Sequence, residues 1–138
     1  MQTLPIRLHP GEDLRQAIEA AVRRHNCRAA FVLSGIGSLS TAGIRFAGAD
    51  KPQRLTGDME ILSLSGTVAF DCSNSQSHVH MALSTVTGEV LGGHVAPGCT
   101  VRTTAEVLLA LLPEWEFARE HDAVTGYDEM VVRARQAV

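Results

Sequence analysis

Two strand-like runs joined by a short glycine-containing segment constrain the fold more than any other part of the chain. They are residues 78–84 (HVHMALS) and 89–95 (EVLGGHV), with Gly88 just before the second run. Turn residues between two such runs are typical of a β-hairpin. Side chains at positions i and i+2 of a strand share one face, so His78 and His80 point the same way. The chain therefore places at least two imidazoles on one face of an antiparallel strand pair.

The length of the hairpin loop decides whether His94 joins the other two histidines. A two-residue loop would turn the His94 side chain away from them. A three-residue loop over residues 86–88, with glycine in the left-handed position, is the more common pattern for this sequence and sets His80 opposite His94. Directly opposed residues have Cβ atoms about 4.5–5.5 Å apart, and His78 would be a diagonal neighbour. We predict this second register.

Three converging imidazoles form a candidate metal site. The alternative is that they only hydrogen-bond with neighbours or solvent. Neutral imidazoles bind Zn, Ni, Cu and Fe, and three of them leave one or more positions of a divalent ion open for water or a ligand. Gly92 and Gly93 leave space beside His94 for a ligand or another backbone. We predict a metal site made of His78, His80 and His94, and the residue types do not choose among these metals.

Two segments have helical patterns. Residues 14–24 carry apolar side chains at helical spacing after the acidic Asp13, and basic residues end the segment. Residues 103–106 (TTAE) have the form of a capping box, and the apolar residues after them predict a second helix that ends at Pro113. We therefore expect two helices.

The other segments predict strands. Residues 29–33 are a continuous apolar run, expected of a strand buried on both faces, and a glycine-rich turn is predicted at residues 34–38. Late strands are expected at residues 115–119 and 130–133, around a turn at residues 124–126. The expected fold class is α+β, with a mixed, largely antiparallel sheet flanked by two helices. At 138 residues the chain is expected to be a single domain over residues 1–138.

Composition and charge limit the partners and the compartment. The formal net charge is −3, whereas proteins that bind nucleic acid through its phosphates are usually basic, so we expect no autonomous nucleic-acid binding. No apolar run approaches the roughly 18–20 residues that span a bilayer, and the first residues lack the pattern of a signal peptide. The three cysteines, Cys27, Cys72 and Cys99, have no paired spacing, which suits a reducing compartment. We expect a cytoplasmic protein without membrane contact.

Seven short segments together resemble the plants-and-prokaryotes-conserved (PPC) domain family in its stand-alone prokaryotic form. In chain order they are residues 10–13 (PGED), 34–38 (SGIGS), 44–45 (IR), 59–66 (MEILSLSG), 78–80 (HVH), 88–94 (GEVLGGH) and 125–128 (TGYD). The resemblance implies a homotrimer built on a mixed sheet flanked by helices. It also implies a divalent metal, often zinc, bound by His78, His80 and His94 in a cleft near the subunit boundary. Plant members contact DNA through an Arg-Gly-Arg-Pro AT-hook, and that motif is not in these 138 residues.

The histidine site is compatible with three classes of function. The leading hypothesis is a small trimeric metal-binding module that binds a small-molecule ligand or a partner protein, because no catalytic base or nucleophile is evident beside the triad. The first alternative is a metal-dependent hydrolase or lyase that uses the open coordination position, with Glu60 and Glu89 as the nearest expected carboxylates. The second is a DNA-associated regulator, which the lack of an AT-hook and of a basic patch disfavours.

Overall fold

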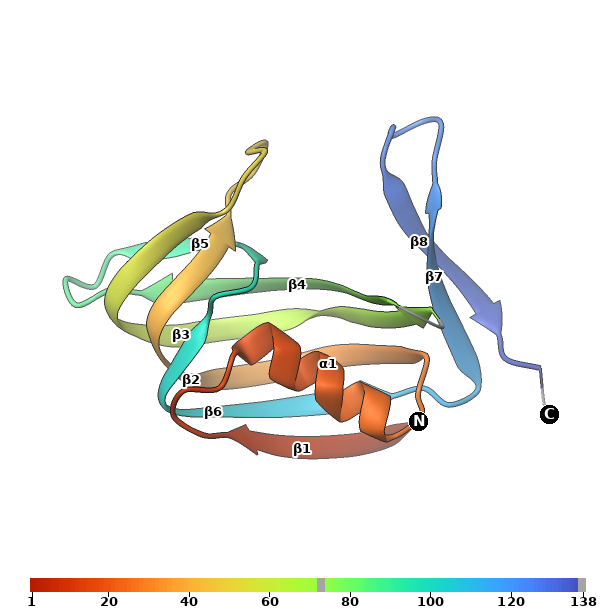
Figure 1. Cartoon of the computed structure of the whole chain (residues 1–138), viewed down its shortest axis with the longest axis horizontal. Helices are drawn as coiled ribbons and strands as arrows, with labels where there is room; N and C mark the ends of the chain where they lie inside the picture. The colour runs from red at the N-terminus through yellow and green to blue at the C-terminus, as the bar shows by residue number, and fades with distance from the viewer. Residues whose placement is uncertain (72–73, 137–138) are drawn as a thin grey trace.

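Long antiparallel strands make up most of the molecule, whose computed structural model describes residues 1–71 and 74–136. In chain order the elements are β1 (Gln2–Leu8), α1 (Leu14–Arg24), β2 (Ala29–Arg45), β3 (Gln53–Asp71), β4 (Asn74–Ser84), β5 (Val90–Val95), β6 (Thr100–Leu111), β7 (Trp115–His121) and β8 (Asp128–Ala134). The helix lies across one face of the main sheet, and β7 and β8 form a separate hairpin at one end (Figure 1).

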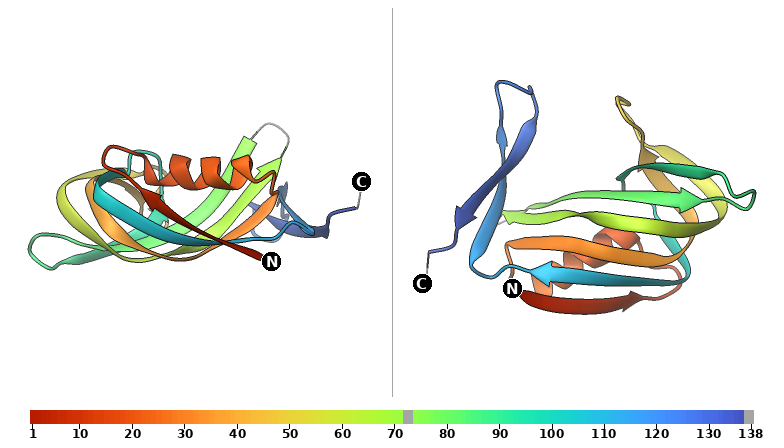
Figure 2. Two further views of the ribbon diagram at one scale, coloured as in Figure 1. Left: turned by 90° about the horizontal axis from the view of Figure 1, so that it is seen from below. Right: turned by 180° about the vertical axis from the view of Figure 1, so that it is seen from behind.

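The strand order places the histidine hairpin at an edge of the main sheet. Its six strands run in the order β1-β6-β2-β3-β4-β5, and every pairing between them in the described chain is antiparallel. The sheet is therefore antiparallel rather than mixed. β5 also pairs with the C-terminal end of β2, where Arg45 is the register partner of His94. The strands consequently curl back on themselves near the histidines, and the curvature is visible in the left view of Figure 2.

The first predicted helix is confirmed as α1. The Asp13 carboxylate caps it by accepting a hydrogen bond from the backbone N–H of Gln16 at 3.0 Å. Arg23 and Arg24 lie in the last turn, where positive charge is favoured by the helix dipole. The buried side chains of the helix belong to the same core as the sheet and are Leu14, Ile18, Ala21 and Val22. Burial of each large aliphatic side chain stabilises the fold by about 1.5–3 kcal/mol.

The second predicted helix is wrong, and the two-helix α+β class with it. Residues 103–111 belong to β6, so the described chain is predominantly β with one helix. A short apolar run fits a buried strand as well as a helix, and β6 buries Val107 and Leu109 between β1 and β2. The Thr103 hydroxyl, expected to cap a helix, instead hydrogen-bonds with the Ser38 hydroxyl at 2.6 Å. Pairing with strands on both sides overrides the local capping pattern.

The prediction of a turn at residues 34–38 is wrong, because this glycine-rich segment is the middle of β2. A Cβ on Gly37 would lie 2.3 Å from the carbonyl oxygen of Thr104, so the glycine is needed where β6 approaches β2 closely. The apolar run before this segment also differs from the prediction. Phe31 and Leu33 are exposed, and β2 is not buried on both faces there.

The late hairpin predicted around residues 124–126 is confirmed as β7 and β8. Phe117 is 3% exposed, packs on the ends of β2 and β3, and meets the ring of Phe31 edge to face with centroids 5.7 Å apart. Arg28 and Glu116 form an ion pair at 2.8 Å beside it. These contacts hold the base of the hairpin against the main sheet.

Two expectations drawn from composition bear on the core and on membranes. Cys27 and Cys99 are buried free thiols, and Cys72 lies outside the described residues. Within residues 1–71 and 74–136, no helix has the length and apolar character needed to cross a membrane.

Candidate metal centre

The β4–β5 hairpin adopts the predicted three-residue loop. The backbone N–H of Thr85 donates to the Glu89 carbonyl, and that of Gly88 donates to the Thr85 carbonyl, both at 2.9 Å. Gly88 has a φ of +78°, a left-handed conformation that glycine adopts without steric cost. This register makes His80 the direct partner of His94.

Ring nitrogens of the three histidines converge on one point. Nε2 of His78 and Nε2 of His80 are 3.1 Å apart, and Nε2 of His80 is 3.2 Å from Nδ1 of His94. One nitrogen from each residue lies within 4.8 Å of the other two. Two nitrogens bound to a tetrahedral zinc ion at about 2.0–2.1 Å are themselves about 3.3 Å apart. Two of the three nitrogen pairs have this spacing, which suits a tetrahedral divalent ion that keeps a fourth position for another ligand.

Burial and nearby guanidinium groups favour the neutral form of two of the imidazoles. The pKa of His78 is lowered from 6.5, first by partial burial and then by the positive charge of Arg119. The pKa of His94 is lowered from 6.5 by partial burial and then by the charge of Arg45. Because metals bind the unprotonated nitrogen, both shifts extend the pH range in which the triad can act as a ligand set.

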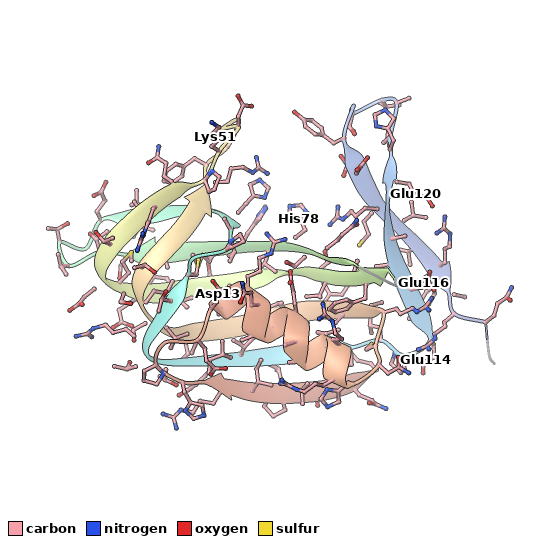
Figure 3. All side chains as sticks on the ribbon, viewed as in Figure 1. Asp13, Lys51, His78, Glu114, Glu116 and Glu120 are labelled. Carbon is pink, nitrogen blue, oxygen red and sulfur yellow. The ribbon has the colours of Figure 1, made fainter. Side chains whose placement is uncertain are left out.

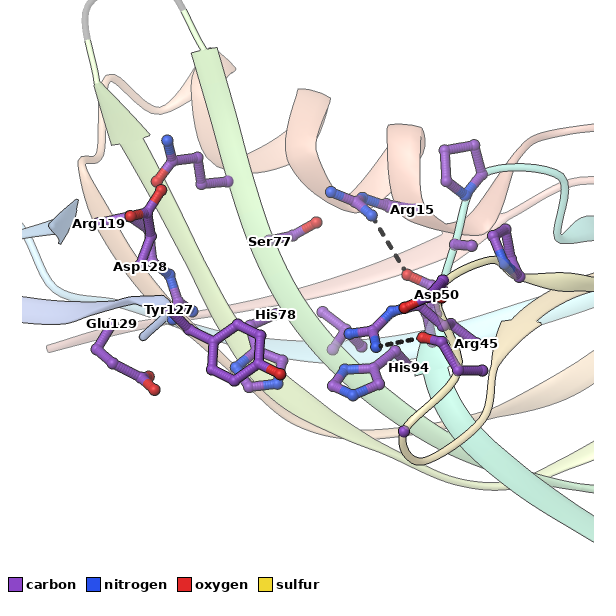
Figure 4. A pocket seen from close by; sticks show the side chains of 18 residues that line it. Arg15, Arg45, Asp50, Ser77, His78, His94, Arg119, Tyr127, Asp128 and Glu129 are labelled. Atoms are coloured by element: carbon purple, nitrogen blue, oxygen red, sulfur yellow. Dashed lines mark hydrogen bonds between the residues drawn. The ribbon is translucent and has the colours of Figure 1, made fainter. Parts of the chain in front are cut away.

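His78 and His94 of the triad line a cleft between the main sheet and the β7–β8 hairpin. Its volume is about 930 Å³, at the upper end of the roughly 300–1,000 Å³ that small-molecule sites occupy. Figure 3 shows His78 between the loop that carries Lys51 and the hairpin that carries Glu120. The charged side chains that line the cleft come from five different segments (Figure 4) and are Arg15, Arg45, Asp50, Arg119, Asp128 and Glu129.

The sequence did not predict which charged residues would gather in this cleft. Glu60 and Glu89, the carboxylates expected nearest the triad, are not among the described residues that line it, whereas Asp128 and Glu129 are. The sequence shows that a late hairpin exists but carries no signal for where the hairpin packs. Arg45 lies between the apolar Ile44 and Phe46, a common pattern in strands that does not mark it as a cleft residue.

Comparison with known proteins identifies the family. A model described as the Plants and Prokaryotes Conserved (PCC) domain matches residues 1–113. The chain belongs to this family. The resemblance carried by the short motifs is thereby confirmed. The matched residues include the main sheet and the triad and end just before β7, so the β7–β8 side of the cleft lies outside the match.

Known proteins similar to this PCC-domain chain include a longer protein and two solved structures. Bifunctional protein GlmU from a Synechococcus strain is 41% identical over 133 residues, which are 96% of this chain and 20% of that protein. The chain thus spans about a fifth of the length of the curated relatives it matches. A hypothetical protein from Salmonella has 38% identity and a TM-score of 0.89, with 98% of this chain and 95% of that chain covered. A metal-containing protein from Archaeoglobus fulgidus has 30% identity and a TM-score of 0.80, with 95% and 94% covered.

Proposed function

We propose that this PCC domain is a small cytoplasmic metal-binding module in which His78, His80 and His94 bind a divalent ion, zinc by preference. The observation that carries the proposal is the convergence of three ring nitrogens, two pairs of which have the spacing of neighbouring zinc ligands. A similar protein from Archaeoglobus fulgidus contains metal, which supports it.

The bound ion is proposed to hold a small-molecule ligand rather than to serve the fold alone. Structural zinc sites are closed by four protein ligands, whereas the triad supplies three. His78 and His94 also line a cleft large enough for a small molecule. A ligand that enters the cleft would meet the open coordination position.

The module is proposed to work as a homotrimer. The sheet face turned away from α1 exposes apolar side chains on three adjacent strands, and such patches mark interaction surfaces. These side chains are Leu33, Ile36, Leu62 and Leu108, with exposed fractions of 48%, 56%, 51% and 37%. Contact between copies of the chain would cover them.

Native mass spectrometry of the untagged protein, before and after addition of zinc, tests metal binding and assembly together. The proposal expects a trimer that carries three zinc ions and a His80→Ala trimer that carries none. His9→Ala, which removes an exposed histidine outside the triad, should behave like the wild type. A monomer would contradict the assembly, and a zinc-saturated sample without bound ions would contradict the metal site.

Metal-dependent hydrolysis is a second candidate, favoured by the position of Glu129. Its carboxylate lines the same cleft as His78 and acts electrostatically on that imidazole. A carboxylate beside a metal site can accept the proton of an attacking water molecule. With a panel of phosphate and acyl esters, this candidate expects zinc-dependent turnover that falls about 100-fold in Glu129→Gln at unchanged metal content. Turnover that survives the substitution would exclude this role for Glu129.

A further inference from the structure

Three arginines from separate elements line the cleft beside the triad. Arg15 comes from α1, Arg45 from the end of β2 and Arg119 from β7. The guanidinium of Arg15 is already paired, because it lies 3.0 Å from the Glu19 carboxylate and also donates to the carbonyl of Val95. The charge of Arg15 is therefore largely compensated within the protein.

Arg45 and Arg119 differ from Arg15 in having no such carboxylate. Neither forms an ion pair with any residue in the described parts of the chain. One nitrogen of Arg45 donates to the Ala49 carbonyl at 3.2 Å, which leaves further donors of its guanidinium for other partners. Both residues are half-buried and line the wall of the cleft.

These two arginines stand on either side of the triad. Arg45 is the strand partner of His94, and Arg119 is the charged residue with the largest effect on His78. Figure 4 shows the two side chains in different parts of the same cleft. A ligand that reaches the histidines from the cleft would lie within the field of both guanidinium groups.

The formal charges of the lining favour a negative ligand once a divalent ion is bound. Because Arg15 is paired with Glu19, only Arg45 and Arg119 stand against the three lining carboxylates, and the two charges of the ion leave a net charge of +1. The carboxylates are Asp50, Asp128 and Glu129. Two unpaired guanidinium groups next to a cation are unfavourable unless an anion compensates them. Arginine also presents a planar pair of donors that matches a carboxylate or phosphate group.

We propose that the cleft binds a small molecule through an oxyanion group, a carboxylate or a phosphate, that fills the open metal position and contacts Arg45 and Arg119. This inference rests on the proposed metal-binding function. Arg119 belongs to the hairpin beyond residue 113, where the family match ends. The β7–β8 hairpin therefore supplies one side of the proposed ligand site.

The first step of the test establishes metal binding. Untagged wild-type protein and the variants Arg45→Gln, Arg119→Gln and Arg102→Gln are titrated with Co²⁺, whose visible absorption reports its coordination. Arg102 is the matched control, since it pairs with Asp58 at 3.0 Å and does not line the cleft. All four proteins should bind about one ion per chain. Failure of the wild type to bind cobalt would overturn the metal-binding function, and this inference with it, at this step.

The second step adds the oxyanion to the cobalt-loaded proteins, with methyl phosphate and acetate as separate probes. We expect at least one probe to change the cobalt spectrum of the wild type and of Arg102→Gln with the same affinity. Arg45→Gln and Arg119→Gln each remove a charge-assisted contact, so each should weaken the binding of that probe about tenfold. The probe that binds more tightly distinguishes a phosphate site from a carboxylate site.

Two results would overturn the inference while leaving metal binding intact. One is a cobalt-loaded wild type whose spectrum neither probe changes, and the other is wild-type affinity in either cleft variant. If a glutamine variant does not fold, Arg45→Lys or Arg119→Lys takes its place. Each lysine variant keeps the charge but loses the planar donors, so it should bind the probe about threefold or more weakly than the wild type. Unchanged affinity for the probe would overturn the inference.

Discussion

Arg45 and His94 are strand partners where β5 meets the end of β2, although they lie far apart in the sequence. This pairing draws the end of β2 up to the histidine hairpin and brings a guanidinium group beside one imidazole of the triad. Burial lowers the pKa of His94 most, and the positive charge of Arg45 lowers it further. The curl of the sheet thus joins the candidate metal ligands to the charged wall of the cleft.

The titration of the triad should reflect its surroundings. In the metal-free protein we expect NMR midpoints below 6.5 for His78 and His94, since burial and then Arg119 or Arg45 lower their pKa. The unfolded chain then binds more protons than the folded chain just below pH 6.5, so the metal-free protein should lose stability as the pH falls through that range. Zinc affinity should fall over the same range, because protons compete for the same nitrogens.

Arg119→Gln provides the control for this titration. It should move the His78 midpoint upward and leave that of His94, whose arginine neighbour is Arg45, nearly unchanged. A wild-type midpoint at or above 6.5 for both histidines would contradict the electrostatic description of the site.

Gly66 should be among the least replaceable residues of the sheet. A Cβ there would lie 2.2 Å from the carbonyl oxygen of His78 and 2.6 Å from the Cα of Val79, on β4, the strand that carries His78 and His80. Gly66→Ala should lower the free energy of unfolding in urea by about 3 kcal/mol or more. Gly48→Ala is the control, because Gly48 has a positive φ but open space around it, and should cost about 1–2 kcal/mol. Equal losses would show that the close approach to β4 is not a constraint.

Phe117 should hold the β7–β8 hairpin in place independently of the metal site. Phe117→Ala removes a ring that is 3% exposed, and should reduce amide-exchange protection in β7 and β8 by about 3 kcal/mol. Val132→Ala alters its strand partner, which is 49% exposed, and should cost less than about 1 kcal/mol. Zinc affinity should stay the same in both variants, and a loss of zinc in Phe117→Ala would mean that the hairpin supports the triad.

Cys99 should be chemically inert in the folded protein. Burial raises its pKa to about 11, which leaves only about one thiolate in a thousand at pH 8. Iodoacetamide at pH 8 should therefore alkylate Cys99 far more slowly in native protein than in urea, as followed by mass spectrometry of the peptide that contains it. Equal rates in the two states would contradict the buried position.

The histidine hairpin was predictable because its information is local. The glycine at position 88 selects the loop, the loop fixes the register, and the register sets His80 opposite His94. The capped α1 helix was predictable for the same reason. Short motifs also identified the family, and six of the seven lie within residues 1–113, which the family model matches.

The errors lie where packing between distant segments decides the outcome. Residues 103–111 carry a helix-like cap and a continuous apolar run, and only the neighbours β1 and β2 make them a strand. The turn expected at residues 34–38 is a strand because β6 passes close to Gly37. Arg119 reaches the cleft through the packing of Phe117 at the base of the hairpin, which no local pattern reports.

The metal content of untagged protein, purified without chelators or nickel resin, tests the central claim most directly. Elemental analysis should find about one divalent ion per chain, with zinc the main metal, and close to none in His80→Ala. His9→Ala should retain the wild-type content. Less than about a tenth of an ion per wild-type chain, with no recovery after zinc is added, would contradict the account.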